Sequence, residues 1–229
     1  MAVTPNTDEA FLREVDEELR RDQVAGIWTR YGRWIIAAIV VGLAGFGGYL
    51  LWQGWSHGQA EKQTVSLQQA YDSIDAGNTQ AAAAPLNDLA GSSAPGYRAL
   101  AKLAQGDQLL AAGKTKEAAA KFGEVAGDSS LAQPLRDLAL IRQTQTDYDN
   151  LPPQTVIDRL KGYVTKDSAW LGSAGELVGI AYLKLHKFSE ARATFKLVAE
   201  SEQVPDTLRQ RAVQAVSAVD ALATDQKGK

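Results

Sequence analysis

The chain has 229 residues, with 24 Lys and Arg against 27 Asp and Glu, and no cysteine. This near balance of charge, without a basic cluster, argues against a nucleic-acid partner, and the missing cysteine excludes disulfides, thiolate metal sites and a cysteine nucleophile. Packing alone must therefore stabilise any folded domain.

Residues 1–33 predict a charged amphipathic helix. Glu9 with Arg13 and Asp16 with Arg20 are acid–base pairs four residues apart with the acid N-terminal, which is the favourable order in a helix. An apolar stripe accompanies them, made of Phe11, Val15 and Leu19. Two interpretations stay open: a solvated helix leading into the next element, or a contact for a cytosolic partner or the membrane interface.

Residues 34–56 predict a membrane-spanning signal-anchor. No charged side chain occurs in this range, and the 19 residues from Trp34 to Trp52 form a helix of roughly 28 Å, close to the hydrocarbon thickness of a bilayer. Trp34 and Trp52 supply amphipathic rings for the two interfaces. A buried core helix is the alternative, but such helices rarely stay apolar on every face for five turns.

The flanking charges predict the orientation of this span. Arg30 and Arg33 precede it directly, whereas the 20 residues after Gln53 contain only Lys62 as a basic residue. Basic residues are retained in the cytoplasm, so residues 1–33 are predicted to be cytoplasmic and the rest translocated. A cleaved signal peptide fits less well, because it has a short basic leader and an apolar run of about 7–15 residues.

After the span, residues 57–223 predict an all-α domain of helical hairpins, followed by a disordered tail at 224–229. Two segments superimpose at an offset of 73 residues without gaps. The matched positions pair a small or apolar residue with its equivalent: Gly106 with Gly179, Leu109 with Tyr182, Ala118 with Ala191, and Phe122 with Phe195. This spacing is typical of the tetratricopeptide repeat, in which small residues let helices approach and a large apolar residue fills the seam.

Weaker matches extend the repeat in both directions. Val156, Leu160 and Tyr163 follow Ala118, Phe122 and Val125 at an offset of 38, and Gly77 precedes Gly113 by 36. The predicted hairpins are 58–90, 96–126, 131–165 and 169–200, closed by a helix at 205–223. The alternative is an unrelated all-helical bundle, because the third hairpin matches only weakly.

The sequence offers no convincing catalytic, cofactor or metal site. Gly113-Lys114-Thr115 imitates the end of a phosphate-binding loop, but Gln108 stands where that loop requires glycine. The chain has two histidines, His57 and His186, which complete neither a metal site nor a catalytic triad. We therefore expect no enzyme activity, no cofactor and no small-molecule substrate.

Two surfaces remain as candidate contacts for protein partners. Within the span, small residues recur four apart, which allows close helix–helix contact in lipid: Ala38 and Gly42, and Ala44 and Gly48. In the repeat domain, the concave face is the expected groove. The asparagines after the span are near turns, which does not favour a clamp for a peptide's C-terminal carboxylate, so apolar and mixed contacts are expected.

The chain resembles the YfgM-like family of bacterial inner-membrane proteins. Three segments carry the resemblance: Phe11 to Glu18, Trp28-Thr-Arg-Tyr-Gly32, and the repeats that end in Ala181-Tyr182 and Glu190-Ala191-Arg192. The resemblance implies a single-pass anchor with a periplasmic repeat domain. It further implies association with the SecYEG translocon and with a membrane-bound periplasmic chaperone of the PpiD type, to assist protein export. An envelope assembly or division scaffold away from the translocon is the alternative function.

Overall fold

Helices form every regular element of the computed structural model, which describes the backbone of residues 7–227 and the side chains of residues 30–34, 36–53 and 58–224. The chain divides into two units, Met1–Lys62 and Gln63–Lys229. In chain order the helices are α1 (Thr7–Asp75), α2 (Thr79–Ala90), α3 (Pro95–Ala111), α4 (Thr115–Ala126), α5 (Gln133–Thr146), α6 (Pro153–Leu160), α7 (Leu171–Lys184), α8 (Phe188–Ala199) and α9 (Asp206–Lys227), with short 3₁₀ turns at Tyr148–Asn150 and Lys161–Tyr163.

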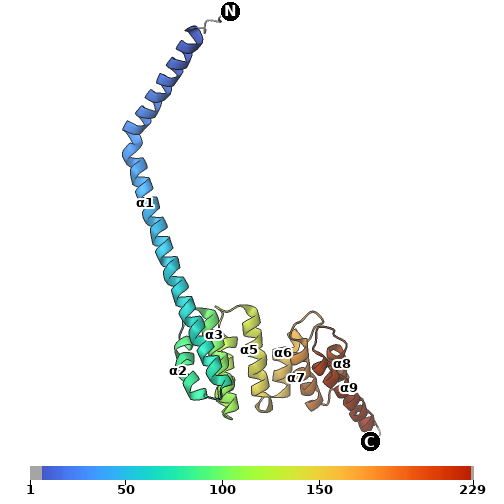
Figure 1. Ribbon diagram of the computed structural model, residues 1–229. Coiled ribbons are helices and arrows are strands. Elements are labelled where there is room, and N and C mark those ends of the chain that lie inside the picture. The colour runs from blue at the N-terminus through green and yellow to red at the C-terminus, as the bar shows by residue number, and fades with distance from the viewer. Residues whose placement is uncertain (1–6, 228–229) are drawn as a thin grey trace, which may run out of the picture. The chain divides into compact units, whose positions relative to one another are not determined.

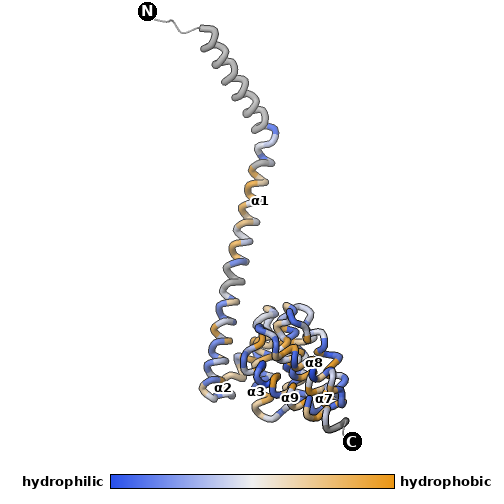
Figure 2. Tube along the Cα trace, turned by 90° about the vertical axis from the view of Figure 1, so that its right-hand side faces the viewer, coloured by the Kyte–Doolittle hydropathy of each residue, from blue (hydrophilic) through white to orange (hydrophobic). Residues whose placement is uncertain are grey.

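Helix α1 passes through the sequence boundaries expected at residues 33 and 56 without a break. The junction around Gly58 contains no proline, and a glycine costs a helix interior only about 1 kcal/mol. Within Arg30–Asp75, an 18-residue window has a mean hydropathy of 2.1, and none of its residues is buried in the protein. This helix, whose middle part carries most of its orange segments in Figure 2, is long and apolar enough to cross a membrane.

The helices of the second unit pack in chain order as hairpins (Figure 1). Helices α3 and α4 form the predicted hairpin at 96–126, and α7 and α8 form the one at 169–200. In the weakly matching third hairpin, α5 is followed by the shorter α6, which shares a core cluster with α5 but packs mainly on α7. The predicted all-α architecture, an apolar N-terminal helix followed by packed helical hairpins, is confirmed.

Three helix ends share the same backbone turn. Gly77 and Gly113 each have a φ of 74°, and His186 has a φ of 58° at the corresponding place in the α7–α8 hairpin. After each of them, the next amide N–H bonds back to a carbonyl five residues earlier: Asn78 to Ser73, Lys114 to Leu109, and Lys187 to Tyr182. This is the Schellman motif, which satisfies carbonyls left open at a helix C-terminus.

The hydrophobic core is divided into clusters along the stack. One cluster joins the end of α1 to α2 and α3, with Ala70 and Leu86 fully buried. The next clusters lie around Phe122 and Leu160, and the last ones join α7 and α8 to α9 through Val198 and Val219. Each helix is thus stabilised by its neighbours in the stack, as in other solenoid proteins.

The last helix ends later than the sequence suggests. Helix α9 begins at Asp206 and continues to Lys227, four residues beyond the expected end at 223. Val219 is fully buried against α8, so apolar packing reaches the last turns of the helix. Of the expected tail at 224–229, the final two residues lie outside the described part of the chain.

Candidate functional site

The predicted repeat positions meet at two equivalent seams. A Cβ placed on Gly106 in α3 would lie 2.6 Å from Cε1 of Phe122 in α4. A Cβ placed on Gly179 in α7 would likewise lie 2.5 Å from Cζ of Phe195 in α8. Both rings are buried. The missing side chain of each glycine is therefore what lets the ring of the next helix lie against the backbone.

The other predicted packing residues also lie at helix contacts. Ala118 and Ala191 are fully buried on α4 and α8. Tyr182 is half-buried on α7 and packs against two neighbouring core clusters, one toward α6 and one toward α9. These side chains stabilise the stack.

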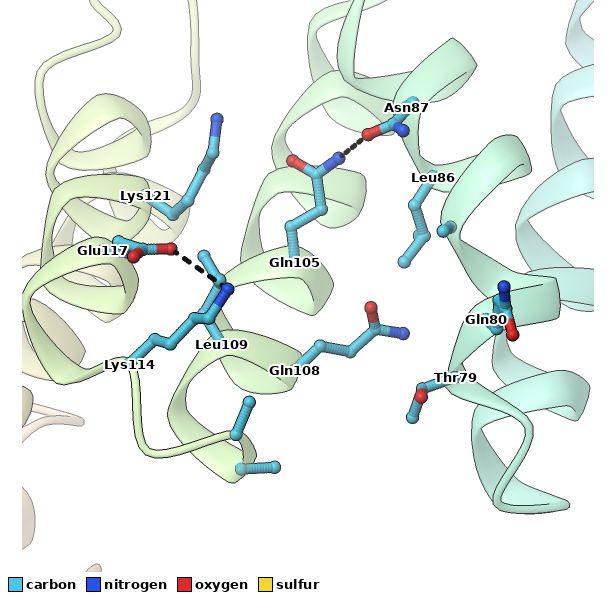
Figure 3. Close-up of a pocket in the computed structure, with 13 residues that line it drawn as sticks. Thr79, Gln80, Leu86, Asn87, Gln105, Gln108, Leu109, Lys114, Glu117 and Lys121 are labelled. Atoms are coloured by element: carbon cyan, nitrogen blue, oxygen red, sulfur yellow. Dashed lines mark hydrogen bonds and ion pairs between the residues drawn. The ribbon is translucent and has the colours of Figure 1, made fainter.

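A groove lies between α2, α3 and the start of α4, with a cavity volume of 680 Å³ (Figure 3). Odd-numbered helices α3, α5, α7 and α9 pack successively on one another along the stack. The groove instead has the even-numbered helices α2 and α4 as its walls and α3 as its floor. It is therefore on the opposite side of the stack from the face where the sequence predicts a ligand groove.

Amide side chains dominate the polar lining of this groove. Gln105 Nε2 donates a hydrogen bond to Asn87 Oδ1 at 2.8 Å, which joins α3 to α2. Figure 3 shows Gln108 extended from α3 into the space in front of α2. Among the described side chains, neither Gln105 Oε1 nor Gln108 Nε2 has a hydrogen-bond partner, although both atoms are buried. A buried polar group left in this state costs about 1–3 kcal/mol.

Two lysines and one glutamate form the charged edge of the groove. Lys114 Nζ lies 3.8 Å from Glu117 Oε2, a pair visible in Figure 3. Lys121 points along the groove wall and pairs with Glu124 at 3.1 Å. A hydrogen bond from Lys102, assisted by Lys121, lowers the pKa of Glu124, so this carboxylate stays charged near neutral pH.

Sequence reasoning did not find this groove. The available signal was the recurrence of amides on adjacent helices at helical spacing, with Asn87 on α2 and Gln105 and Gln108 three apart on α3. Single glutamines are ordinary surface residues. The pattern indicates a site only once α2 is known to pack on α3, because this packing places the amide side chains next to one another. Lys114, which imitates part of a phosphate-binding loop, lies at the same groove edge.

A second, smaller cavity of 170 Å³ lies between α7, α8 and α9. Its lining is mainly apolar and includes Ile180 and Leu208, and an ion pair from Arg211 to Glu176 crosses its edge. Among the residues with described side chains, no three His, Asp or Glu gather as a metal site requires.

The predicted anchor residues are all exposed on α1. Trp34 and Trp52 are 65% and 63% exposed, and Arg30 and Arg33 are exposed at the N-terminal edge of the apolar stretch. The small residues Ala38, Gly42, Ala44 and Gly48 are exposed as well. A Cβ on Gly42 or Gly48 would meet nothing within 4 Å, so none of the described side chains packs against this face.

Comparison with known proteins agrees with this geometry. The sequence profile of a tetratricopeptide repeat-like domain matches residues 26–222. The chain belongs to this family. No curated protein and no solved structure shows significant similarity to it.

The family match includes the apolar stretch as well as the helical hairpins. The match begins at residue 26, before that stretch, and ends at residue 222 in α9. Tetratricopeptide repeat-like domains are protein-interaction scaffolds whose stacked helices present extended surfaces. Membership of this family therefore indicates that the chain binds protein partners. It does not say which proteins these are.

Proposed function

We propose that this chain is a membrane-tethered, non-catalytic adaptor that holds a repeat scaffold at a bacterial inner membrane to bind protein partners during export. Residues 34–56 span the membrane, 1–33 lie in the cytoplasm, and 57–223 form the periplasmic domain. One observation carries the proposal. A fully exposed apolar helix and a stack of helical hairpins occur in one chain of the repeat-like family.

The orientation is supported by the charges beside the span. Arg30 and Arg33 lie at the N-terminal end of the apolar stretch, where positive charge favours retention in the cytoplasm. Exposed Trp34 and Trp52 suit the two interfaces, where an indole combines an apolar body with a polar N–H. The N-terminus is therefore cytoplasmic and the repeats are periplasmic.

The resemblance to the YfgM-like family supports the SecYEG translocon and a membrane-bound periplasmic chaperone of the PpiD type as partners. The small residues Ala38, Gly42, Ala44 and Gly48 offer one contact surface, because their backbone can approach a neighbouring helix closely in lipid. The repeat domain offers another. The anchor and the repeats thus bind through different surfaces.

The decisive experiment purifies the tagged full-length protein in mild detergent and identifies bound proteins by mass spectrometry. Translocon and chaperone subunits are expected with the native chain. Replacement of Gly42 and Gly48 by isoleucine is expected to reduce their recovery, whereas the matched control Leu43→Ile leaves it unchanged. Recovery of envelope assembly or division proteins in place of the translocon would contradict the export assignment and favour the alternative scaffold.

The topology can be tested separately, because the chain has no cysteine of its own. A cysteine introduced at exposed Ser93, between α2 and α3, should react in intact cells with a membrane-impermeant maleimide that passes the outer membrane. A cysteine at Thr4 should react only after the inner membrane is opened. The reverse pattern of labelling would overturn the proposed orientation.

A further inference from the structure

The groove between α2, α3 and α4 contains hydrogen-bonding groups that the described part of the chain does not satisfy. Gln105 Oε1 is an acceptor and Gln108 Nε2 is a donor, and both are buried without a partner among the described side chains. We propose that this groove binds an extended segment of another polypeptide. Its main chain pairs with these two amides, and an acidic side chain of the segment faces Lys114 and Lys121.

The spacing of the two amides fits one residue of an extended main chain. Gln105 and Gln108 are three apart on α3, so they are neighbours on one face, with Cβ atoms about 5–6 Å apart. In a β-strand, the N–H and C=O of one residue point to the same side and bond the same partner residue. Such a residue can donate its N–H to Gln105 Oε1 and accept a hydrogen bond from Gln108 Nε2.

The groove has room for this segment and a mechanism for opening the amides to it. Its volume of 680 Å³ lies within the usual range of about 300–1,000 Å³ for ligand sites. The terminal torsion of glutamine is broad, so the two amides can rotate from their covered positions toward an incoming chain, and Gln105 then exchanges its hydrogen bond to Asn87 for one to that chain. Leu86 and Leu109 add apolar surface beside them (Figure 3).

The charge at the groove edge selects an acidic segment. The lining contains Lys114 and Lys121 against the single carboxylate of Glu117. Each lysine already contacts one glutamate, at 3.8 Å and 3.1 Å respectively. Because an ammonium group has three donors, each lysine keeps donors for a further carboxylate. A basic segment would instead face two like charges.

The test uses the full-length protein in lipid nanodiscs and fluorescent ten-residue peptides, with binding measured by anisotropy. A peptide of alternating Glu and Thr is expected to bind. Two others are expected to bind at least about tenfold more weakly: the same peptide with Lys in place of Glu, and the Glu–Thr peptide N-methylated along one main-chain edge. Equal binding of the methylated peptide would overturn the main-chain contact, and equal binding of the Lys peptide would overturn the selection by charge.

Variants assign the binding to the groove. Gln105→Leu with Gln108→Leu, and separately Lys114→Gln with Lys121→Gln, should each weaken the Glu–Thr peptide by about tenfold. Gln210→Leu, at an exposed position of α9, is the matched control and should bind as the wild type does. The leucine pair removes two unpaired polar atoms but also the hydrogen bond from Gln105 to Asn87, so circular dichroism and thermal unfolding are measured to show that the variant is folded. Unchanged binding by both folded double variants would overturn the proposal.

This inference rests on the proposed adaptor function, because it names where and through what chemistry a partner binds. The two fail in different ways. If the Glu–Thr peptide binds but the translocon is not recovered, the groove is confirmed as a binding site and the proposed role in export is wrong. If the groove variants still recover the translocon and no peptide binds to any form of the protein, the adaptor function is retained and the groove is rejected as a binding site.

Discussion

Two glycines of the repeat seams have a steric role that no other residue can take. Gly106 and Gly179 each face the ring of a phenylalanine from the next helix at a distance that excludes even one methyl group. The rings are large and fully enclosed, so they cannot move aside without disturbing neighbours that are packed at crystal-like density. The cost of a larger side chain at these positions is therefore strain in the backbone of a helix pair.

Gly106→Ala is expected to lower the free energy of unfolding by about 1–3 kcal/mol, because the added methyl overpacks the Phe122 ring. Chemical denaturation of the full-length protein in detergent measures it. Gly96→Ala in the same helix is the control, since a Cβ there meets nothing within 4 Å. That variant should be unchanged or up to about 1 kcal/mol more stable. Equal effects at the two glycines would contradict the seam.

His186 holds a left-handed backbone conformation that glycine adopts more easily. Its φ of 58° matches the 74° of Gly77 and Gly113 at the equivalent turns. His186→Gly should therefore raise the free energy of unfolding by roughly 1 kcal/mol, despite the loss of the edge contact to Phe188. Gly113→His is the matched reverse change and should lower it by a similar amount. Thermal unfolding at one pH measures both, and a loss of stability in His186→Gly would contradict the argument.

At the scale of helices, one polar connection links α3 to the turn between α4 and α5. Arg98 donates to Asp128 Oδ2 at 2.9 Å and to the carbonyl oxygen of Ser92 at 2.9 Å. Ser130 donates to Asp128 Oδ1 from both its hydroxyl and its backbone N–H. These bonds, that of the Ser130 hydroxyl first, lower the pKa of Asp128 to about 2.

The lowered pKa of Asp128 makes stability depend on pH in a defined window. A carboxyl whose pKa is lower in the folded state stabilises the fold above its ordinary pKa, and this stabilisation is lost as the pH falls toward the folded value. The melting temperature should therefore fall between about pH 4 and pH 2. Asp128→Asn should have a lower melting temperature than the wild type at pH 7. Its melting temperature should also fall less than that of the wild type between pH 4 and pH 2. Parallel curves for the two proteins would contradict a role for this carboxyl.

The sequence predicts the helical elements well for reasons that are local. Ala118, Phe122 and their equivalents repeat at fixed spacing, and glycine and proline mark most of the turns, so the hairpin bounds follow from short-range pattern. The left-handed turn at His186 is found only in the structure, where Gly77 and Gly113 have the same conformation at the equivalent places of two other hairpins. The groove at Gln105 depends on how α2 packs on α3, and that arrangement is not encoded in any one segment.

At the scale of the whole molecule, stability is distributed between neighbouring helices. The cluster around Val198 and the one around Phe195 both depend on α9, whereas the cluster around Leu86 depends on the end of α1. In a stack of this kind, stability is approximately a sum of repeat and nearest-neighbour terms. A change at one end therefore has most effect on the hairpin beside it.

Ending the chain before Pro205 removes α9 and exposes the apolar side of the α7–α8 hairpin. Hydrogen exchange should then show a loss of amide protection in α7 and α8 and little change in α2 to α4. A chain ended after Ala221, which keeps the buried Val219, is the control and should retain protection throughout. Uniform loss along the whole domain would show one cooperative unit instead of a stack.

The division of the core into successive clusters also gives the domain a mechanical character. Under tension, hairpins held by separate clusters yield one after another, so the force needed stays low while the extension grows. The hairpin with the shortest second helix, α6 at Pro153–Leu160, is the expected place of first yielding. If the domain is held at a membrane while a partner pulls on its surface, its hairpins should therefore unfold one after another. Single-molecule force spectroscopy should record this as stepwise lengthening.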